Sequence, residues 1–180
     1  MRVISGLARG RKLKEPVGNG IRQTSDLVKE AIFNIVQFDI EGRRVLDLFA
    51  GTGQLGVEAL SRGANNVVFV DSSPGAVKLI WENLKICGFS DRASVYTRDG
   101  LKHLERDGSY DLIFIDPPYD SPLACLAVEK IIKFDKLAAN GIIICETRAD
   151  CLLPAVSGPY CLSKQYRYGG VKITRYTRES

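Results

Sequence analysis

Asp116-Pro-Pro-Tyr119 is the stretch whose residue types point most directly to chemistry. Consecutive prolines have fixed φ angles and lack N–H groups, so the carbonyl of Pro117 is held rigidly. An ionised aspartate only accepts hydrogen bonds. Together, Asp116 and the Pro117 carbonyl form a pair of acceptors suited to an exocyclic amino group, and the ring of Tyr119 offers a surface on which a base can stack. The stretch predicts a pocket for the amino group of a nucleobase. A rigid turn without a ligand is the alternative.

A second stretch, residues 45–56, joins an apolar run to a glycine-rich turn. The spacing Gly51-x-Gly53-x-x-Gly56 fits the dinucleotide fingerprint, in which a ligand lies against the amino terminus of a helix. Asp47 lies inside the expected strand that precedes this turn. A pyrophosphate gains nothing from a carboxylate there, whereas the ammonium group of S-adenosylmethionine (SAM) does. The stretch therefore favours SAM, and a tight turn with no ligand remains the alternative for the glycine spacing alone.

Further carboxylates are expected at the ends of neighbouring strands. Ligands of an open α/β sheet bind beyond the carboxyl ends of its strands, where Asp71 could accept both ribose hydroxyls and Asp99 could meet the adenine amino group. Either aspartate could instead cap the helix that follows it. No metal ligands are predicted. The candidate catalytic residues are Asp116, Pro117 and Tyr119, and the candidate cofactor-binding residues are Asp47, Phe49, Gly51, Gly53, Asp71 and Asp99.

The elements that would hold these residues alternate between strand and helix. Gly169-Gly170 separates two runs with strand character, which is typical of a hairpin. The expected fold class is α/β, a doubly wound, Rossmann-like SAM methyltransferase fold with a mostly parallel seven-stranded sheet and a C-terminal antiparallel hairpin. Strands are predicted at 44–48, 66–71, 93–97, 110–116, 141–146, 160–168 and 171–176, and helices at 25–37, 54–62, 74–86, after 100, and at 121–134.

Composition favours an ordinary globular protein. The chain has 180 residues, of which 45% are apolar and 26% charged, as expected for one domain with a real core. Its apolar runs are too short to span a bilayer and its start has no continuous hydrophobic region, so we expect a cytoplasmic protein. The five cysteines include no C-x-x-C pair, which argues against a zinc cluster or a disulfide framework. His103, the only histidine, is expected on a helix surface.

The two ends of the chain are basic, although the net charge is only +4. Gly6 and Gly10 could bound the turn of a short hairpin between 2–5 and 11–13. We therefore divide the chain into a basic arm or hairpin at 1–20, lying outside the core, and a methyltransferase domain at 21–180. Basic ends favour an anionic partner, with a solvated surface equally compatible. The cations before Glu15 are Arg2, Arg9, Arg11, Lys12 and Lys14.

With these motifs in view, the chain resembles the RsmD-like methyltransferases, which methylate guanine N2 in bacterial 16S ribosomal RNA. The resemblance covers nearly the whole chain. It is carried by Arg2-Val-Ile-Ser-Gly-Leu-Ala-Arg-Gly-Arg-Lys-Leu13, by Arg22-Gln-Thr-Ser-Asp-Leu-Val-Lys-Glu-Ala-Ile-Phe-Asn34, by residues 47–64 and by Asp116-Pro-Pro-Tyr119. The sequence departs from the family at Gln23, usually proline, and at Leu27, usually arginine, which puts one RNA contact in doubt.

The resemblance implies SAM as cofactor and a guanine of the position-966 type as target. It also implies that Asp116 to Tyr119 form the pocket for that base. The expected partner is ribosomal RNA, within a small-subunit particle or an assembly intermediate, with no membrane contact. The RNA-binding residues expected are Arg2, Arg9, Arg11, Lys12, Arg22 and Thr24.

Three other interpretations stay open. An amino methyltransferase could act on adenine N6 or cytosine N4, although the chain lacks an obvious insert for recognising a DNA sequence. A nicotinamide-dependent oxidoreductase would explain the glycine spacing and Asp71 but would leave Asp116-Pro-Pro-Tyr119 without a role. A non-catalytic RNA-binding module could keep the fold. Binding of SAM against NAD, and methyl transfer itself, separate these classes.

Overall fold

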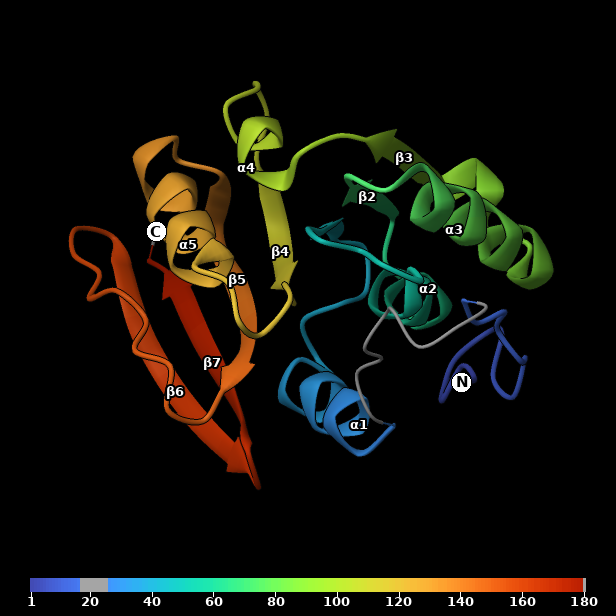
Figure 1. The fold of residues 1–180 in the computed structure, drawn as a ribbon, viewed down its shortest axis with the longest axis horizontal. Helices are drawn as coiled ribbons and strands as arrows, with labels where there is room; N and C mark the ends of the chain where they lie inside the picture. Colours follow the sequence, from blue (N-terminus) through green and yellow to red (C-terminus); the bar gives the residue numbers. More distant parts are fainter. Residues whose placement is uncertain (17–25, 180) are drawn as a thin grey trace.

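The computed structural model describes residues 1–16 and 26–179, and a seven-stranded sheet forms its centre (Figure 1). The strand order is β3-β2-β1-β4-β5-β7-β6. The first five strands in this order run parallel, and β7 pairs antiparallel with both β5 and β6. The predicted sheet and its C-terminal hairpin are confirmed. The strands are β1 (Arg44–Asp47), β2 (Asn66–Asp71), β3 (Ala93–Thr97), β4 (Tyr110–Ile115), β5 (Leu137–Arg148), β6 (Tyr160–Tyr168) and β7 (Val171–Arg178).

One helix precedes β1, and the others connect successive parallel strands, as predicted. Ser73 caps α3 by accepting a hydrogen bond from the Ala76 N–H, Pro74 occupies its first turn, and Gly88 ends it in the left-handed conformation. These are ordinary start and stop signals of a helix. The helices are α1 (Asp26–Ile35), α2 (Gln54–Ser61), α3 (Pro74–Cys87), α4 (Gly100–His103) and α5 (Leu123–Lys133), with a short 3₁₀ turn, η1 (Ser90–Arg92), before β3.

Two apolar clusters cover the two faces of the sheet. Alternate strand residues face opposite sides: Val45 packs with Ile32, Leu60 and Ile80, from α1, α2 and α3. Leu46 belongs to the other cluster, which includes side chains of α5. The sheet is thus a middle layer between α1, α2 and α3 on one face and α4 and α5 on the other (Figure 1). This layering leaves the carboxyl ends of the parallel strands free to carry a site.

The connections place a crevice beside β1. The chain moves outward from β1 through β2 to β3, then returns to β4 on the other side of β1. Such a reversal of strand order is where ligands bind in doubly wound sheets. β1 pairs with β2 through Leu46 and Val68, and with β4 through Leu46 and Ile113. The carboxyl ends of β1, β2 and β4 therefore meet at one edge of the sheet.

The basic arm is packed on the domain, and the prediction that it lies outside the core is wrong. Val3, Ala8 and Leu13 are buried within the cluster that covers α1, α2 and α3. The predicted hairpin is reduced to a single bridge between Arg2 and Lys12. The division into an arm at 1–20 and a domain at 21–180 remains a prediction.

The prediction for His103 is also wrong. Its side chain is buried and shares a hydrogen bond of 2.9 Å with the Tyr110 hydroxyl. Burial, and then the nearby cations Arg98 and Arg106, lower the pKa of His103 to about 4. The five cysteines are free, and Cys87 and Cys145 are buried. Among the described residues, none of the helices is long and apolar enough to cross a membrane.

Candidate active site

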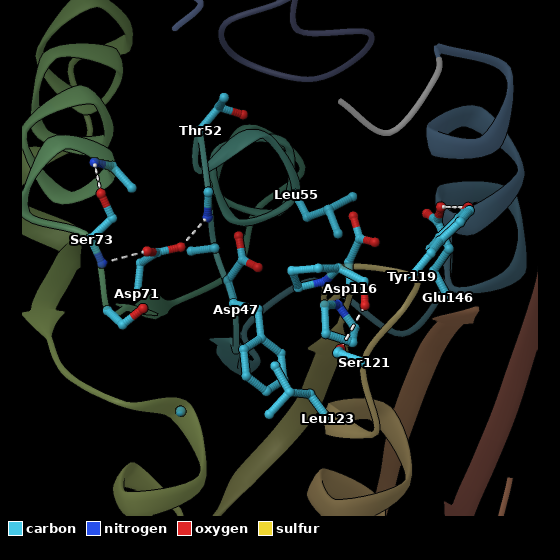
Figure 2. A pocket seen from close by; sticks show the side chains of 18 of the residues that line it. Asp47, Thr52, Leu55, Asp71, Ser73, Asp116, Tyr119, Ser121, Leu123 and Glu146 are labelled. Atoms are coloured by element: carbon cyan, nitrogen blue, oxygen red, sulfur yellow. Dashed lines mark hydrogen bonds between the residues drawn. The ribbon is translucent and has the colours of Figure 1, made fainter. Parts of the chain in front are cut away.

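A pocket of about 610 Å³ opens at the carboxyl ends of β1, β2 and β4. Asp47 from β1, Asp71 from β2 and Asp116 after β4 all line it, together with Glu146 from β5. Figure 2 shows Asp116 between Asp47 on one side and the pair formed by Tyr119 and Glu146 on the other. The structure therefore brings the predicted cofactor turn and the predicted base pocket into one continuous cavity.

Asp47 is a buried carboxyl group in the floor of this pocket. Only 2% of the residue is exposed, and its Oδ2 accepts a hydrogen bond of 2.9 Å from the Gly56 N–H. Burial, followed by the charges of Asp116 and Asp71, raises the pKa of Asp47 to about 8 despite that bond. A buried carboxyl group of this kind gains a stable charge when a cation binds beside it. The ammonium group of an amino acid moiety fits this requirement.

Asp71 organises the turn next to Asp47. Its Oδ2 accepts the Gly51 N–H and its Oδ1 accepts the Ser73 N–H, both at 2.8 Å (Figure 2). A carboxylate has about four acceptor positions, so these bonds leave capacity for a pair of hydroxyl groups. The side chain that caps α3 is Ser73 rather than Asp71. The position of Asp71 fits the predicted contact with a ribose.

Phe49 and Asp99 line the part of the pocket next to α4. Phe49 has a left-handed backbone with φ of 76°, which is rare for a residue with a bulky side chain. A Cβ at Gly100 would lie 2.8 Å from the Phe49 ring, so glycine is required there. Asp99 caps α4 by accepting the Lys102 N–H at 2.9 Å. Asp99 is therefore a helix cap, which was the alternative interpretation of this residue from the sequence. It also lines the pocket.

The glycines of the fingerprint serve different purposes. Gly51 lines the pocket. Gly53 has φ of 75°, and a Cβ there would meet Ile80 at 3.1 Å. A Cβ at Gly56 would lie 2.1 Å from the ring of Phe69. A side chain at Gly53 would thus press on the core between α2 and α3 rather than on a ligand, and Gly56 allows α2 to pack closely on β2.

Asp116-Pro-Pro-Tyr119 forms the wall opposite the glycine turn. All four residues line the pocket. The Ser121 hydroxyl donates to the Pro118 carbonyl at 2.6 Å, which fixes the turn. The Tyr119 hydroxyl donates to Oε1 of Glu146, also at 2.6 Å (Figure 2). These bonds hold an acceptor group and an aromatic ring in place at the end of β4.

A buried side chain of α3 links the arm to the pocket. Asn83 of α3 accepts the Lys14 N–H at 2.7 Å and donates to the carbonyls of Lys14 and Thr52, at 3.2 and 3.0 Å. Thr52 belongs to the glycine turn and lines the pocket. Glu58 and Ser61 of α2 hold the arm from a second side, since Glu58 accepts the N–H groups of Ile4 and Ser5 and Ser61 accepts that of Ala8.

The predicted RNA-binding residues divide into two groups. Arg2, Arg9 and Lys12 are exposed on the arm, and so is Arg11, whose guanidinium donates to the Ile86 carbonyl. The second group, Arg22 and Thr24, lies outside the described residues, as does Gln23. Leu27, at the start of α1, is exposed.

Two further residues of the site, Glu146 and Asn83, were not predicted from the sequence. Glu146 follows the apolar run Ile142–Cys145, and this strand-end position is the same signal that identified Asp71 and Asp116. Asn83 lies among polar and apolar residues in the middle of α3, where its spacing gives no indication of a role. Its importance arises from contacts that only the tertiary structure creates.

Comparisons with known proteins agree with this arrangement. A family model described as Conserved hypothetical protein 95 matches residues 1–177. The chain is 37% identical over 182 residues to the Bacillus subtilis protein YlbH, with 99% of both chains covered. It is 37% identical over 155 residues to ribosomal RNA small subunit methyltransferase D of Haemophilus influenzae, covering 83% of this chain and 80% of the relative. Against the Escherichia coli protein of the same name it is 31% identical over 181 residues, covering 100% and 91%.

The fold is also similar to those of solved methyltransferase structures. The structure of yhhF from Escherichia coli has a TM-score of 0.90 at 30% identity and covers 99% of this chain and 98% of its own. An RNA methyltransferase from Salinibacter ruber, solved in complex with S-adenosyl-L-homocysteine, has a TM-score of 0.68 at 15% identity, with 88% and 95% covered, which is a likeness of fold alone. The fold and its pocket define a protein of the SAM-dependent methyltransferase class. Within that class, the chain belongs to the Conserved hypothetical protein 95 family, which includes ribosomal RNA small subunit methyltransferase D.

Proposed function

We propose that this protein transfers a methyl group from SAM to the exocyclic N2 of a guanine in small-subunit ribosomal RNA. The observation that carries the proposal is the position of Asp116-Pro-Pro-Tyr119 in the same pocket as Asp47 and Asp71. The family supports ribosomal RNA as the substrate, because curated relatives carry that activity in their names. The choice of guanine N2 rests on the chemistry of the pocket and on the family resemblance. An rRNA substrate favours a cytoplasmic location.

The residues of the glycine turn fit SAM. Asp47 offers a buried carboxyl group for the ammonium, Asp71 offers acceptor positions for the ribose, and Asp99 and Phe49 flank the place for an adenine. A nicotinamide dinucleotide would bring a pyrophosphate close to Asp47, where its negative charge would disfavour ionisation of the carboxyl group and gain no ion pair. When bound, SAM supplies an electrophilic methyl group.

The other wall of the pocket would hold the base. Asp116 and the Pro117 carbonyl accept the two hydrogens of the amino group, which turns the nitrogen lone pair toward the methyl donor. Correct orientation of two reacting groups can lower a barrier by about 7–11 kcal/mol. The methyl–sulfur bond breaks as the methyl–nitrogen bond forms, and the Asp116 carboxylate would offset the positive charge on the nitrogen and accept the proton that it then loses. Tyr119 stacks on the base, which must leave its own stack to enter the pocket.

Nucleoside analysis tests this function directly. Small-subunit rRNA from a strain lacking the gene is incubated with the purified protein and isotopically labelled SAM, then digested and separated by mass. We expect label in N2-methylguanosine. Label in N6-methyladenosine or N4-methylcytidine would support the alternative amino methyltransferases instead. Binding of NAD but not SAM would favour the oxidoreductase, and binding of RNA without transfer would favour the non-catalytic module.

A further inference from the structure

Glu146 is the carboxylate of the pocket that the proposed chemistry leaves without a role. It lies near the carboxyl end of β5, is only 4% exposed and faces the cavity that Asp116 and Tyr119 also line. Its Oε1 accepts the Tyr119 hydroxyl at 2.6 Å. Burying a carboxylate is costly unless hydrogen bonds compensate. A carboxylate fixed in the wall of a binding pocket can also accept a hydrogen bond from a donor group of the ligand, since it has about four acceptor positions.

The sheet register fixes Glu146 beside Asp116. β4 and β5 run parallel, and Ile115 pairs with Cys145 in their ladder. Asp116 and Glu146 each follow one member of that pair, so they leave the two strands at the same level. Neighbouring strands are about 4.8 Å apart. Two carboxylates that begin this close together can contact adjacent donors of one small ring.

We propose that Glu146 selects guanine by accepting its N1–H while Asp116 and the Pro117 carbonyl hold the adjacent amino group. This inference rests on the proposed function. In guanine, N1 carries a hydrogen and shares the carbon C2 with the amino nitrogen N2. In adenine and cytosine, the ring nitrogen next to the amino-bearing carbon has a lone pair instead. An ionised carboxylate accepts from the first and repels the second.

Tyr119 orients this carboxylate. Its hydroxyl donates to Oε1, which fixes the rotation of the Glu146 side chain. The direction in which Oε2 can accept a hydrogen bond is then fixed as well. Tyr119 therefore has two separable parts, because its ring can stack on the base while its hydroxyl positions Glu146. Sites built to hydrogen-bond one substrate group can reject an analogue lacking it by about 10⁴–10⁵-fold.

A base analogue tests the proposal. The target guanine of a substrate RNA is replaced by 2,6-diaminopurine, which keeps the 2-amino group but has a lone pair at N1. We expect wild-type protein to methylate the guanine RNA with kcat/KM about 100-fold or more above that of the analogue RNA, since the repulsion and the lost bond act together. In Glu146→Gln the side-chain amide can donate to N1, and we expect the ratio to fall below about tenfold.

Two further variants make the test specific. Tyr119→Phe keeps the ring and removes the hydroxyl, and should lose part of the discrimination with little change in SAM affinity. Glu129→Gln makes the same chemical change at an exposed position of α5 and should discriminate like wild type. Melting temperatures confirm that each variant is folded.

The outcomes separate this inference from the proposed function. If wild-type protein forms no N2-methylguanosine, the proposed function fails and the inference with it. If it forms N2-methylguanosine but Glu146→Gln and Tyr119→Phe both discriminate as strongly as wild type, only the role of Glu146 is wrong. If Glu146→Gln does not fold, unchanged discrimination by folded Tyr119→Phe overturns the proposal.

Discussion

The raised pKa of Asp47 predicts that ligand binding is coupled to a proton. Its pKa in the ligand-free protein is raised to about 8, first by burial, so the carboxyl group is mostly protonated at pH 7. A bound ammonium favours the ionised form. We predict that SAM binding at pH 7 releases a proton and tightens by up to about tenfold per pH unit as the pH approaches 8. Calorimetry in buffers of different ionisation enthalpy measures the proton.

Asp47→Asn provides the matched control, because its amide oxygen can still accept the Gly56 N–H and the titrating group is gone. Protons exchanged by SAM itself are common to both proteins. Stability gives a second readout. Because the pKa of Asp47 is raised on folding, the contribution of this group to the free energy of unfolding is fully present below about pH 4 and is lost as the pH rises toward 8. Ligand-free wild type should therefore lose stability over this window relative to Asp47→Asn, and equal proton release by the two proteins would contradict the assignment.

Under the proposed mechanism, Asp116 acts on the reaction rather than on the binding of SAM. Asp116→Asn keeps the shape of the side chain but removes the charge that opposes a developing positive charge. We predict a fall of about 10²–10³-fold in the single-turnover rate, with SAM affinity changed by less than about threefold. Asp107→Asn, on an exposed loop before β4, should keep the wild-type rate. A wild-type rate in folded Asp116→Asn would refute the proposed mechanism.

At the scale of elements, the arm supports the cofactor turn. Asn83 joins the Lys14 backbone to the Thr52 carbonyl, and its removal leaves buried polar groups without these bonds. We predict that Asn83→Ala weakens SAM binding by roughly tenfold, on the order of one buried hydrogen bond. The KM for SAM should rise while kcat changes little.

The neighbouring residue supplies a control for Asn83. Glu82 forms an ion pair with the Lys14 side chain at 3.0 Å, on the surface, where such pairs contribute about 0–1 kcal/mol. Glu82→Ala removes a contact between the same two segments but leaves Thr52 untouched. If both variants bind SAM like wild type, the arm and the cofactor turn are independent.

The sequence allowed most elements to be predicted. β2, β3 and β6 begin and end at the predicted residues, because runs with strand character stop at polar or glycine residues. β5 begins at Leu137 rather than at residue 141, because Leu137 pairs with Tyr110 across a register shift. The burial of Val3 and the role of Asn83 depend on contacts between segments far apart in the sequence, which local patterns do not contain. Glu146 is different, because its position at the end of an apolar run was a usable signal.

At the scale of the whole molecule, the arm presents cations on the side of α2 and α3. Arg9 and Lys12 are exposed there. We predict that Arg9→Ala combined with Lys12→Ala weakens RNA binding and flattens its log–log salt dependence by about 0.7–0.9 per lost phosphate contact. SAM affinity and melting temperature should stay unchanged. Filter binding at several salt concentrations measures the slope.

A second double variant tests whether the location of the charges matters. Lys102→Ala combined with Arg106→Ala removes two exposed cations in and just after α4, on the other face of the sheet. It lowers the net charge equally and should leave the salt slope of RNA binding intact. Equal slopes for both double variants would mean that overall charge, rather than the arm, attracts the RNA.

The strand order also dictates when this protein can acquire its ligands during synthesis. A growing chain emerges amino terminus first, yet the arm is anchored by Glu58, Ser61 and Asn83, which are made later. β1 can pair with β2 first, but its other edge is paired only once β4 is made, since Val45 also pairs with Leu112. The arm, which is translated first, can therefore pack only after α2 and α3 have been made. A nascent chain that has reached β3 holds Asp47 and Asp71 but neither Asp116 nor Glu146, so the pocket is completed only when the translation of β5 is nearly finished.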